Sequence, residues 1–222
     1  MDYHINFPDP NLSDDDGLVA VGGELTPDFL ISAYSQGIFP WYSQGDPLMW
    51  WSPNPRLVLF PEDFKVSKSL KQFARKRELE VRIDTSFKEV IYNCAEAKRK
   101  NQDSTWITEE MQEAYIKLNN MGVAHSFETF RNNELVGGLY GVSLGRAFFG
   151  ESMFYWVPNA SKLALLHLVE WAKKHEFMFI DAQQSTSHLK SLGAKDISRT
   201  RFLEMLAQAL KFKSIEGNWW NL

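Results

Sequence analysis

The sequence predicts an α+β protein with a small N-terminal domain at residues 1–62 and a larger domain at residues 63–222. Three strand-like segments at residues 123–130, 135–142 and 147–154 are joined by short turns, which favours an antiparallel meander. A long helical pattern and a short, wholly apolar strand at residues 177–180 follow. The order meander, helix, buried strand, helix is an α+β pattern in which the helix crosses the sheet.

The composition is that of an ordinary globular protein. The chain has 222 residues, of which 44% are hydrophobic and 23% charged, so it can bury a sizeable core. No apolar run approaches the ~18 residues that span a bilayer, and the acidic start resembles no signal peptide. We therefore expect a cytoplasmic protein without a membrane partner. A single cysteine, Cys94, excludes an internal disulfide and a Cys-rich metal site.

The first helix is expected to begin after Thr26, with Pro27 at its first position, and to stop near Gly37. A proline-rich run at residues 37–56 follows and cannot be one regular helix or a central strand. It carries three tryptophans, which either offer stacking surfaces to a base or an apolar ligand or fill a gap between packed layers: Trp41, Trp50 and Trp51.

Short strands and capped helices alternate before the meander. Strands are expected at residues 56–60 and 80–83, and Ser67 can cap a basic helix between them. Two further helices are expected from caps, one opened by a capping box of Ser86 with Glu89 and one opened by Thr108.

The long helix after the meander is expected to begin at a cap supplied by Asn159 or Ser161. Its apolar residues repeat at helical spacing: Leu163, Leu166, Val169 and Ala172.

Positive charge is concentrated in the first half of the chain, although the formal net charge is -4. Basic residues crowd positions 65–77 and again positions 98–100. The net charge argues against nonspecific duplex binding over the whole surface. The local runs are either solvated helix faces or a surface that contacts a phosphate backbone.

Two polar clusters stand where apolar strands carry or end in polar residues. Glu151 lies in the strand-like segment 149–154, where it either faces solvent or is buried against a cation such as a substrate ammonium or guanidinium. Asp181 and Gln183 follow the apolar strand at 177–180, and alternation predicts that they share one side. Asp181 is therefore either a turn former or a ligand-facing group.

Several common enzyme signatures are absent. The chain contains no G-x-S-x-G elbow, P-loop or H-E-x-x-H pair, so serine-hydrolase, nucleotide-hydrolysing and zinc-protease functions lose support. The five histidines have no zinc-ligand spacing, and no metal or other cofactor is expected.

Ten short segments, taken together and in order, resemble the leucyl/phenylalanyl-tRNA-protein transferase family. They are residues 22–25 (GGEL), 37–41 (GIFPW), 50–56 (WWSPNPR), 105–107 (TWI), 124–126 (AHS), 135–141 (LVGGLYG), 150–154 (GESMF), 160–162 (ASK), 181–183 (DAQ) and 188–194 (HLKSLGA). The resemblance covers most of the chain and implies an acetyltransferase-like (GNAT) C-terminal domain. The acetyl-CoA phosphate loop of true acetyltransferases is missing, since residues 157–162 (VPNASK) occupy its place.

The resemblance implies an aminoacyltransferase that moves Leu or Phe, with Met as a further candidate, from aminoacyl-tRNA to proteins beginning with Arg or Lys. The product would carry a signal for N-end-rule degradation. Trp41 and Trp106 match the aromatics that hold the 3′-terminal adenosine. Trp50 and Trp51 are then expected to pack at the junction between the two domains. By the same resemblance, the acyl side chain enters a pocket lined by Leu139, Leu165, Leu166, Leu168, Ala172 and Ile180.

The catalytic assignments also come from the resemblance. Asp181 and Gln183 match a pair in which Asp181 polarises Gln183 and Gln183 orients or helps deprotonate the attacking amine. Because a neutral amide is a poor base, positioning is the larger expected contribution. Glu151 then becomes the candidate partner of the acceptor's cationic residue or amine. With a tRNA substrate, Lys71 and Arg75 on the basic helix are expected to contact phosphates.

Two alternatives remain beside this function: a related transferase acting on proteins that begin with Asp or Glu, and a non-catalytic module that binds tRNA or N-degrons. An acidic Glu151 disfavours the first, and retention of Asp181 with Gln183 disfavours the second. We expect a monomer.

Overall fold

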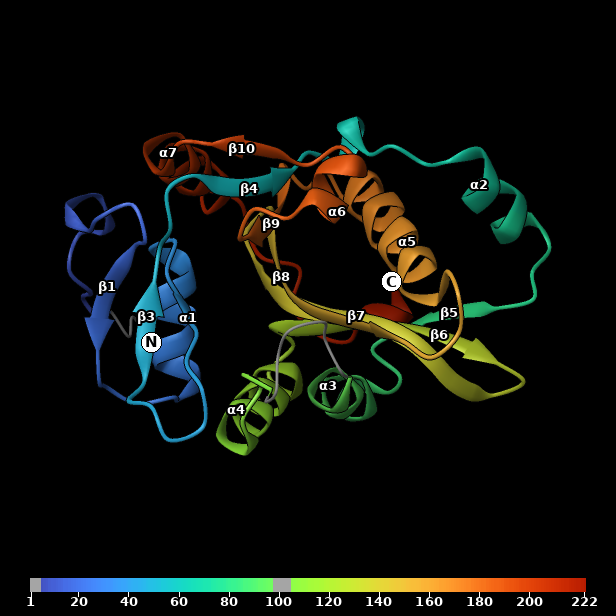
Figure 1. Cartoon of the computed structure of the whole chain (residues 1–222), viewed down its shortest axis with the longest axis horizontal. Helices are drawn as coiled ribbons and strands as arrows, with labels where there is room; N and C mark the ends of the chain where they lie inside the picture. Colours follow the sequence, from blue (N-terminus) through green and yellow to red (C-terminus); the bar gives the residue numbers. More distant parts are fainter. Residues whose placement is uncertain (1–4, 98–104) are drawn as a thin grey trace.

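A small three-stranded sheet and a larger seven-stranded sheet organise the chain (Figure 1). The computed structural model describes residues 5–97 and 105–222. The small sheet has the antiparallel order β1 (Leu18–Val21), β3 (Met49–Trp51), β2 (Phe39–Pro40). Helix α1 (Pro27–Ser35) lies between β1 and β2 in sequence, and Thr26 Oγ1 accepts a 3.4 Å hydrogen bond from the Phe29 N–H. The predicted cap is confirmed.

The proline-rich run folds as separate short pieces. Its prolines lie in the edge strand β2, in the loop between β2 and β3, and after β3, while β3 itself contains none and takes the central place. Trp50 in β3 is 1% exposed, and its ring contacts Phe7 and Phe29 at 5.0 and 6.2 Å. Both ring partners belong to the N-terminal lobe, so Trp50 fills the interior of this lobe.

The large sheet is mixed and mainly antiparallel, as predicted. Only the neighbours β8 and β9 run parallel. Its order is β10 (Lys195–Ile197), β4 (Arg56–Leu59), β9 (Phe179–Gln183), β8 (Ala147–Tyr155), β7 (Glu134–Leu144), β6 (Ala124–Arg131), β5 (Glu80–Ile83). Strand β4 falls within the range 1–62 expected for the N-terminal domain, yet it pairs with β9 and β10 of the large sheet.

Helices cover both faces of the large sheet (Figure 1). Helix α5 (Ala160–Lys174) packs on β6 and β7 from one side and connects the parallel strands β8 and β9. Helices α3 (Phe87–Glu96) and α4 (Glu109–Asn120) pack on the other side. This arrangement confirms the predicted helix crossing between the meander and the buried strand.

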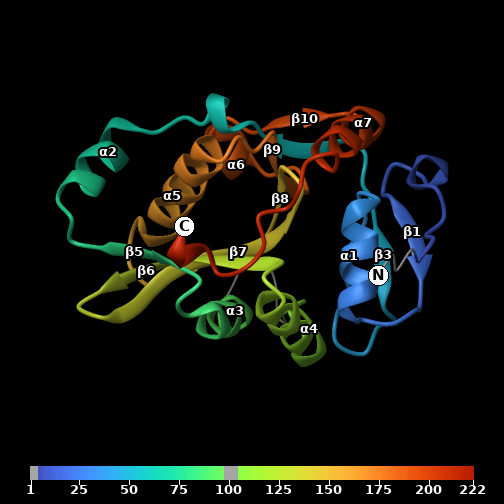
Figure 2. The same ribbon diagram turned by 180° about the vertical axis from the view of Figure 1, so that it is seen from behind.

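The remaining elements are short or peripheral. They are helices α2 (Lys68–Arg75), α6 (Ser187–Ser191) and α7 (Arg199–Ala209) and the 3-10 turns at Pro10–Leu12, Pro61–Asp63 and Trp219–Asn221. The C-terminal segment returns from α7 to the β5 end of the large sheet (Figure 2). There Trp219 stacks between His125 and Trp171, with ring centroids 3.6 Å away on either side.

Side-chain caps are confirmed at two of the four remaining helices for which a cap was predicted. Ser67 and Thr108 accept hydrogen bonds from Leu70 and Met111 at 3.1 and 3.3 Å. The capping box at Ser86 is wrong, because its side chain makes no cap bond. A carboxylate from β6 replaces it: Glu128 accepts the backbone N–H of Ser86 at 3.2 Å.

The start of α5 also differs from the expectation. Asn159 occupies the N-cap position with a φ of 70°, and its side chain makes no cap hydrogen bond. Across residues 5–97 and 105–222, no helix is both long and apolar enough to cross a membrane.

Candidate active site

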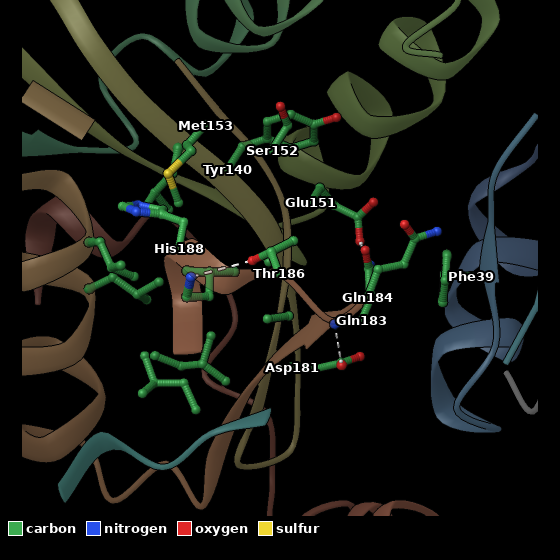
Figure 3. A pocket seen from close by; sticks show the side chains of 18 of the residues that line it. Phe39, Tyr140, Glu151, Ser152, Met153, Asp181, Gln183, Gln184, Thr186 and His188 are labelled. Atoms are coloured by element: carbon green, nitrogen blue, oxygen red, sulfur yellow. Dashed lines mark hydrogen bonds between the residues drawn. The ribbon is translucent and has the colours of Figure 1, made fainter. Parts of the chain in front are cut away.

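A cavity of about 390 Å³ opens between the N-terminal lobe and the end of the large sheet. Aromatic side chains of the N-terminal half form one wall, aliphatic side chains form the floor, and polar groups of β8 and β9 close one end. Figure 3 shows Glu151, Asp181 and Gln183 on the side of the cavity toward Phe39. The residues that line the cavity include Phe39, Trp41, Trp106, Leu139, Glu151, Met153, Leu165, Leu168, Ile180, Asp181, Gln183, Thr186 and His188.

The aliphatic floor comes from three elements. Leu139 lies on β7, Leu165 and Leu168 lie on the inner face of α5, and Ile180 lies on β9. All four side chains are at most 4% exposed. The structure therefore brings four of the six predicted pocket residues to one cavity, where an apolar side chain of a ligand can be buried.

Leu166 and Ala172 do not line this cavity, contrary to the prediction. Successive helical residues are rotated by about 100°, so Leu166 points away from Leu165. Leu166 packs instead with Leu79 and Leu163 in a separate apolar cluster. Ala172 is fully buried one turn beyond Leu168, in the same apolar cluster as the floor residues, but it is not among the residues that line the cavity.

Trp41 and Trp106 meet at the cavity although they lie far apart in sequence. Trp41 follows β2, and Trp106 precedes α4. The backbone carbonyl of Trp41 accepts a 2.7 Å hydrogen bond from Trp51 Nε1, and the two rings meet edge to face at 6.0 Å. Trp51 thus positions Trp41, and both partly exposed rings of the cavity wall remain accessible to a flat ligand group.

Glu151 lies on β8 with only 9% of its surface exposed. Its carboxylate accepts hydrogen bonds from Tyr115 Oη at 3.1 Å and from Gln183 Nε2 at 2.6 Å. Burial raises the pKa of Glu151 to about 7, against the opposing effect of hydrogen bonds from Tyr34, Tyr115 and Gln183. A carboxyl with this pKa exchanges a proton near neutral pH.

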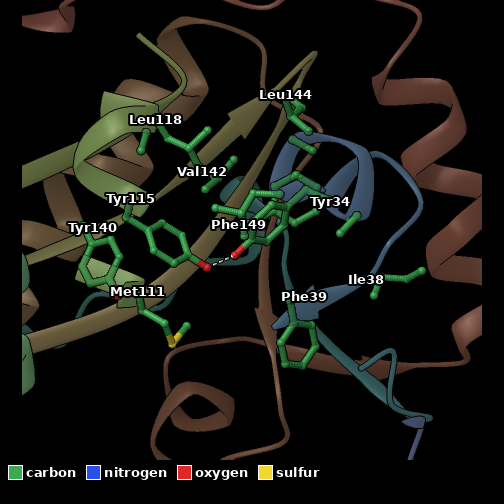
Figure 4. Packing of buried hydrophobic residues seen from close by; sticks show 14 of the residues in the cluster. Tyr34, Ile38, Phe39, Met111, Tyr115, Leu118, Tyr140, Val142, Leu144 and Phe149 are labelled. Atoms are coloured by element: carbon green, nitrogen blue, oxygen red, sulfur yellow. Dashed lines mark hydrogen bonds between the residues drawn. The ribbon is translucent and has the colours of Figure 1, made fainter. Parts of the chain in front are cut away.

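Two buried tyrosines lie beside Glu151. The hydroxyls of Tyr34 and Tyr115 hydrogen-bond to each other there (Figure 4). Tyr34 comes from α1 of the N-terminal lobe and Tyr115 from α4. Desolvation, reinforced by the charge of Glu151, raises the pKa of both tyrosines, so they remain neutral donors.

Asp181 and Gln183 contact each other at the end of β9, and both line the cavity. Gln183 has a φ of 60°, in the left-handed region, which turns its side chain toward Glu151. Asp181 is fully buried, and its Oδ1 accepts the backbone N–H of Gln183 at 2.9 Å. The contact between the two residues therefore runs through the backbone, not through the side-chain amide.

Arg56 is a residue of this site that the sequence reasoning missed. It lies on β4, is fully buried and donates Nε and Nη2 to Asp181 at 2.9 and 2.7 Å. The signal was present as an arginine at the head of an otherwise apolar strand, which requires a buried anion. Its partner could not be named from sequence, because 125 residues separate them.

The rim of the cavity carries two polar residues on the approach to α6. Thr186 caps this helix, and its Oγ1 accepts the Leu189 N–H at 3.3 Å. His188 lies beside Met153 on the side opposite Phe39 (Figure 3). Partial burial and the nearby charge of Lys162 lower the pKa of His188, so it is neutral at pH 7. No group of potential metal ligands occurs within the described part of the chain.

Lys71 and Arg75 lie outside the cavity. Both are exposed on α2, one helical turn apart, and therefore share a face. Helix α2 lies beyond α5, at the end of the molecule away from the N-terminal lobe (Figure 1). The second basic run, at residues 98–100, lies outside the described residues.

Comparisons with known proteins agree with one another. A family model described as "Leucyl/phenylalanyl-tRNA protein transferase" matches residues 58–207, and the model of its N-terminal domain matches residues 23–54. A relative from Desulfatibacillum aliphaticivorans named leucyl/phenylalanyl-tRNA–protein transferase is 54% identical over 97% of this chain and 92% of its own. A relative of the same name from Legionella pneumophila (strain Corby) is 54% identical, covering 98% and 97% of the two chains.

Similarity to solved structures is weaker. A conserved protein of unknown function from Staphylococcus epidermidis gives a TM-score of 0.44 at 9% identity, covering 82% of this chain and 68% of its own. An aminoglycoside acetyltransferase from a soil metagenome gives a TM-score of 0.37 at 13% identity, covering 61% of this chain and 89% of its own.

These matches, together with the fold and the cavity, define an enzyme of the aminoacyltransferase class. Both domain models match in chain order, and the relatives are similar from end to end. The chain belongs to the leucyl/phenylalanyl-tRNA–protein transferase family.

Proposed function

We propose that this protein moves a leucyl or phenylalanyl group from its tRNA to the N-terminal amine of a protein that begins with Arg or Lys. The product begins with Leu or Phe and is a signal for N-end-rule degradation. The reaction takes place in the cytoplasm, where aminoacyl-tRNA is available. The observation that carries the proposal is one cavity whose apolar floor ends at the hydrogen-bonded pair Gln183 and Glu151.

The two parts of the aminoacyl-tRNA end, the acyl side chain and the terminal adenosine, fit the apolar floor and the aromatic wall of the cavity. A leucyl or phenylalanyl side chain is buried among Leu139, Leu165, Leu168 and Ile180, whose surfaces carry no polar group. The terminal adenosine stacks on Trp41 and Trp106 at the cavity wall, an interaction worth ~1–3 kcal/mol per base. The ester carbon between these two groups is then placed near the polar end.

The polar end supplies the groups that an incoming amine needs. The neutral amine attacks the ester carbonyl carbon, a C–N bond forms, and the bond to the tRNA 3′-terminal ribose oxygen breaks. The proton lost by the amine passes to Glu151, and a proton returns to the departing ribose hydroxyl. With a pKa of about 7, Glu151 is suited to both transfers at neutral pH.

Gln183 acts by position. Its Nε2 donates to Glu151 at 2.6 Å, so its amide oxygen is the end that can accept an N–H of the incoming amine. Asp181 holds the Gln183 backbone at 2.9 Å. Because an amide is a very weak base, orienting the amine toward the ester is its main contribution.

The tRNA body is bound elsewhere. The exposed cations of α2, Lys71 and Arg75, suit the phosphate backbone, because such contacts release counterions and need no base recognition. A protein with a formal net charge of -4 then binds an anionic partner through a local patch.

One experiment separates this function from its alternatives. The purified protein is incubated with Leu-tRNA or Phe-tRNA and with peptides beginning with Arg, Lys, Asp or Glu, and extension is followed by mass spectrometry. Extension of Arg and Lys peptides supports the proposal. Extension of only Asp or Glu peptides assigns the acidic-acceptor function. Binding of tRNA without any extension assigns a non-catalytic module.

A further inference from the structure

The guanidinium of Arg56 is fully buried and bidentate to Asp181. It also contacts two aromatic rings, with the centroid of Phe39 4.8 Å away and that of Phe202 4.3 Å away. The cation therefore contacts β2 of the N-terminal lobe and α7 while it neutralises a carboxylate of β9.

Asp181 transmits this arrangement to the polar end of the cavity. Its Oδ1 accepts both Arg56 Nε and the backbone N–H of Gln183, each at 2.9 Å. The same Gln183 has a φ of 60°, a conformation that a residue with a side chain adopts only when its surroundings enforce it. The Gln183 side chain then reaches Glu151.

Stability is a poor explanation for this ion pair. Removing two charges from water costs much of what their attraction returns, so a buried pair stabilises a fold little compared with apolar residues of the same volume. Its effect is geometric, because a bidentate contact sets both the position and the orientation of a carboxylate. The carboxylate that Arg56 orients is that of Asp181, which accepts the backbone N–H of Gln183.

We propose that Arg56 is a positioning residue that, by orienting Asp181, holds Gln183 in its left-handed conformation with its amide directed at Glu151. The proposal rests on the proposed function for its effect on catalysis, but not for its effect on geometry. Arg56 does not line the cavity, so it contacts neither the aminoacyl-tRNA nor the acceptor protein. Replacing it should therefore slow the transfer step and leave the binding of aminoacyl-tRNA intact.

The chain offers a matched control. Arg82 on β5 donates Nε and Nη2 to Glu80 at 2.8 and 2.9 Å and lies 4.3 Å from the ring of Phe130. It repeats the bidentate and aromatic contacts of Arg56 outside the cavity. Arg56→Lys and Arg82→Lys both keep the charge and remove the planar fork.

The test combines kinetics with amide exchange. For Arg56→Lys we expect at least a tenfold fall in kcat, a change of less than twofold in KM for Leu-tRNA, and at least a tenfold faster hydrogen exchange of the Gln183 backbone amide. Arg82→Lys is expected to leave all three unchanged. Wild-type kcat or wild-type Gln183 exchange in Arg56→Lys overturns the proposal.

A second variant covers the case in which Arg56→Lys does not fold. Arg56→Met combined with Asp181→Asn leaves no unpaired buried charge, and it should fold with kcat lowered and KM retained. Because the charge of Asp181 raises the pKa of Glu151, the double variant also shifts the pH–rate profile to lower pH. Wild-type kcat in the double variant contradicts the proposal, as does a parallel loss of kcat and tRNA binding.

The exchange measurement keeps the two proposals distinguishable. If wild-type protein transfers no aminoacyl group, the proposed function fails, and the Gln183 exchange rates of Arg56→Lys and Arg82→Lys still decide the role of Arg56. If the wild type transfers and both arginine variants match it in rate and exchange, only the role of Arg56 fails.

Discussion

The side-chain amide of Gln183 donates a 2.6 Å hydrogen bond to the buried carboxylate of Glu151, 32 residues earlier in the chain. Residue 151 lies on β8 and residue 183 ends β9, and these are the parallel strands that α5 connects. The pair stands where the apolar floor of the cavity ends, so an ester bound by its side chain reaches both residues. The predictions below test this arrangement.

The pH dependence of transfer tests Glu151 as proton acceptor. The ionised form predominates above its pKa of about 7, so the single-turnover rate should rise between pH 6 and pH 8. Glu151→Gln should lose the part of the rise that titrates near pH 7, keep the part that comes from the acceptor amine, and react ~10²–10⁴-fold more slowly. The acceptor amine, with a pKa of ~7.7–8.0, titrates in both proteins and serves as an internal reference. Glu113→Gln, an exposed carboxylate on α4, is the control. Identical profiles for Glu151→Gln and wild type would exclude the role.

The same carboxyl makes the folded state sensitive to pH. Its pKa is raised on folding from 4.5 to about 7, so the folded protein binds more protons than the unfolded chain in that interval. The free energy of unfolding contributed by Glu151 is therefore lost as pH rises through this window, by up to ~3 kcal/mol. Urea titrations at pH 5 and pH 8 should show Glu151→Gln gaining stability relative to wild type at the higher pH. Parallel behaviour of the two proteins would contradict a buried, raised carboxyl.

Trp41→Ala is expected to weaken the binding of aminoacyl-tRNA by about 5- to 150-fold, the equivalent of ~1–3 kcal/mol for one stacked base. Trp51→Ala should reduce both tRNA affinity and thermal stability, because Trp51 Nε1 holds the Trp41 carbonyl at 2.7 Å. Trp220→Ala, which removes a half-exposed ring outside the cavity, is the control. Filter binding and thermal unfolding measure both effects. Unaltered affinity in Trp41→Ala would remove this ring from the adenosine site.

Leu168 is expected to set the size of the acyl group. Leu168→Ala enlarges the floor of the cavity and should raise the ratio of phenylalanyl to leucyl transfer about tenfold, since one methylene discriminates by ~1–3 kcal/mol. Leu166→Ala lies on the same helix but faces another cluster, so it should leave the ratio unchanged. Competition between the two charged tRNAs measures the ratio. Equal shifts in both variants would assign the effect to loosening of α5 rather than to the cavity.

Charge reversal on α2 tests the tRNA contact. Lys71→Glu with Arg75→Glu should weaken tRNA binding at low salt and make the slope of log affinity against log salt shallower by ~1.5–2, since each lost phosphate contact contributes ~0.7–0.9. The exposed Lys211, beyond the end of α7, offers a control reversal. Unchanged affinity at low salt would remove α2 from the interface.

The elements that short-range signals predicted were mostly correct. Thr26, Ser67 and Thr108 cap the helices that follow them, because a cap joins atoms within three residues of each other. The predicted capping box at Ser86 is absent because a residue distant in sequence binds the start of this helix. Glu128, on a strand 42 residues away, accepts its backbone N–H and makes a local capping box unnecessary.

The sequence predicted which residues form the polar end of the site better than it predicted the contacts between them. Resemblance to a family brought Glu151, Asp181 and Gln183 forward together, and the structure places all three at one end of the cavity. The hydrogen bond between Asp181 and Gln183 uses the backbone N–H of Gln183, a detail that alternation along a strand does not predict. Arg56 escaped notice, since the sequence does not say which strand pairs with β4.

The sequence by itself determined the order and type of the main elements, the basic face of α2 and the family of the chain. These depend on periodicity, caps and motifs, which act over a few residues. Only the tertiary structure decided that Leu166 and Ala172 are not part of the cavity lining, and that Arg56 meets Asp181 while contacting the rings of Phe39 and Phe202. Helix rotation, strand order and burial set those contacts, and they form only when distant segments pack against one another.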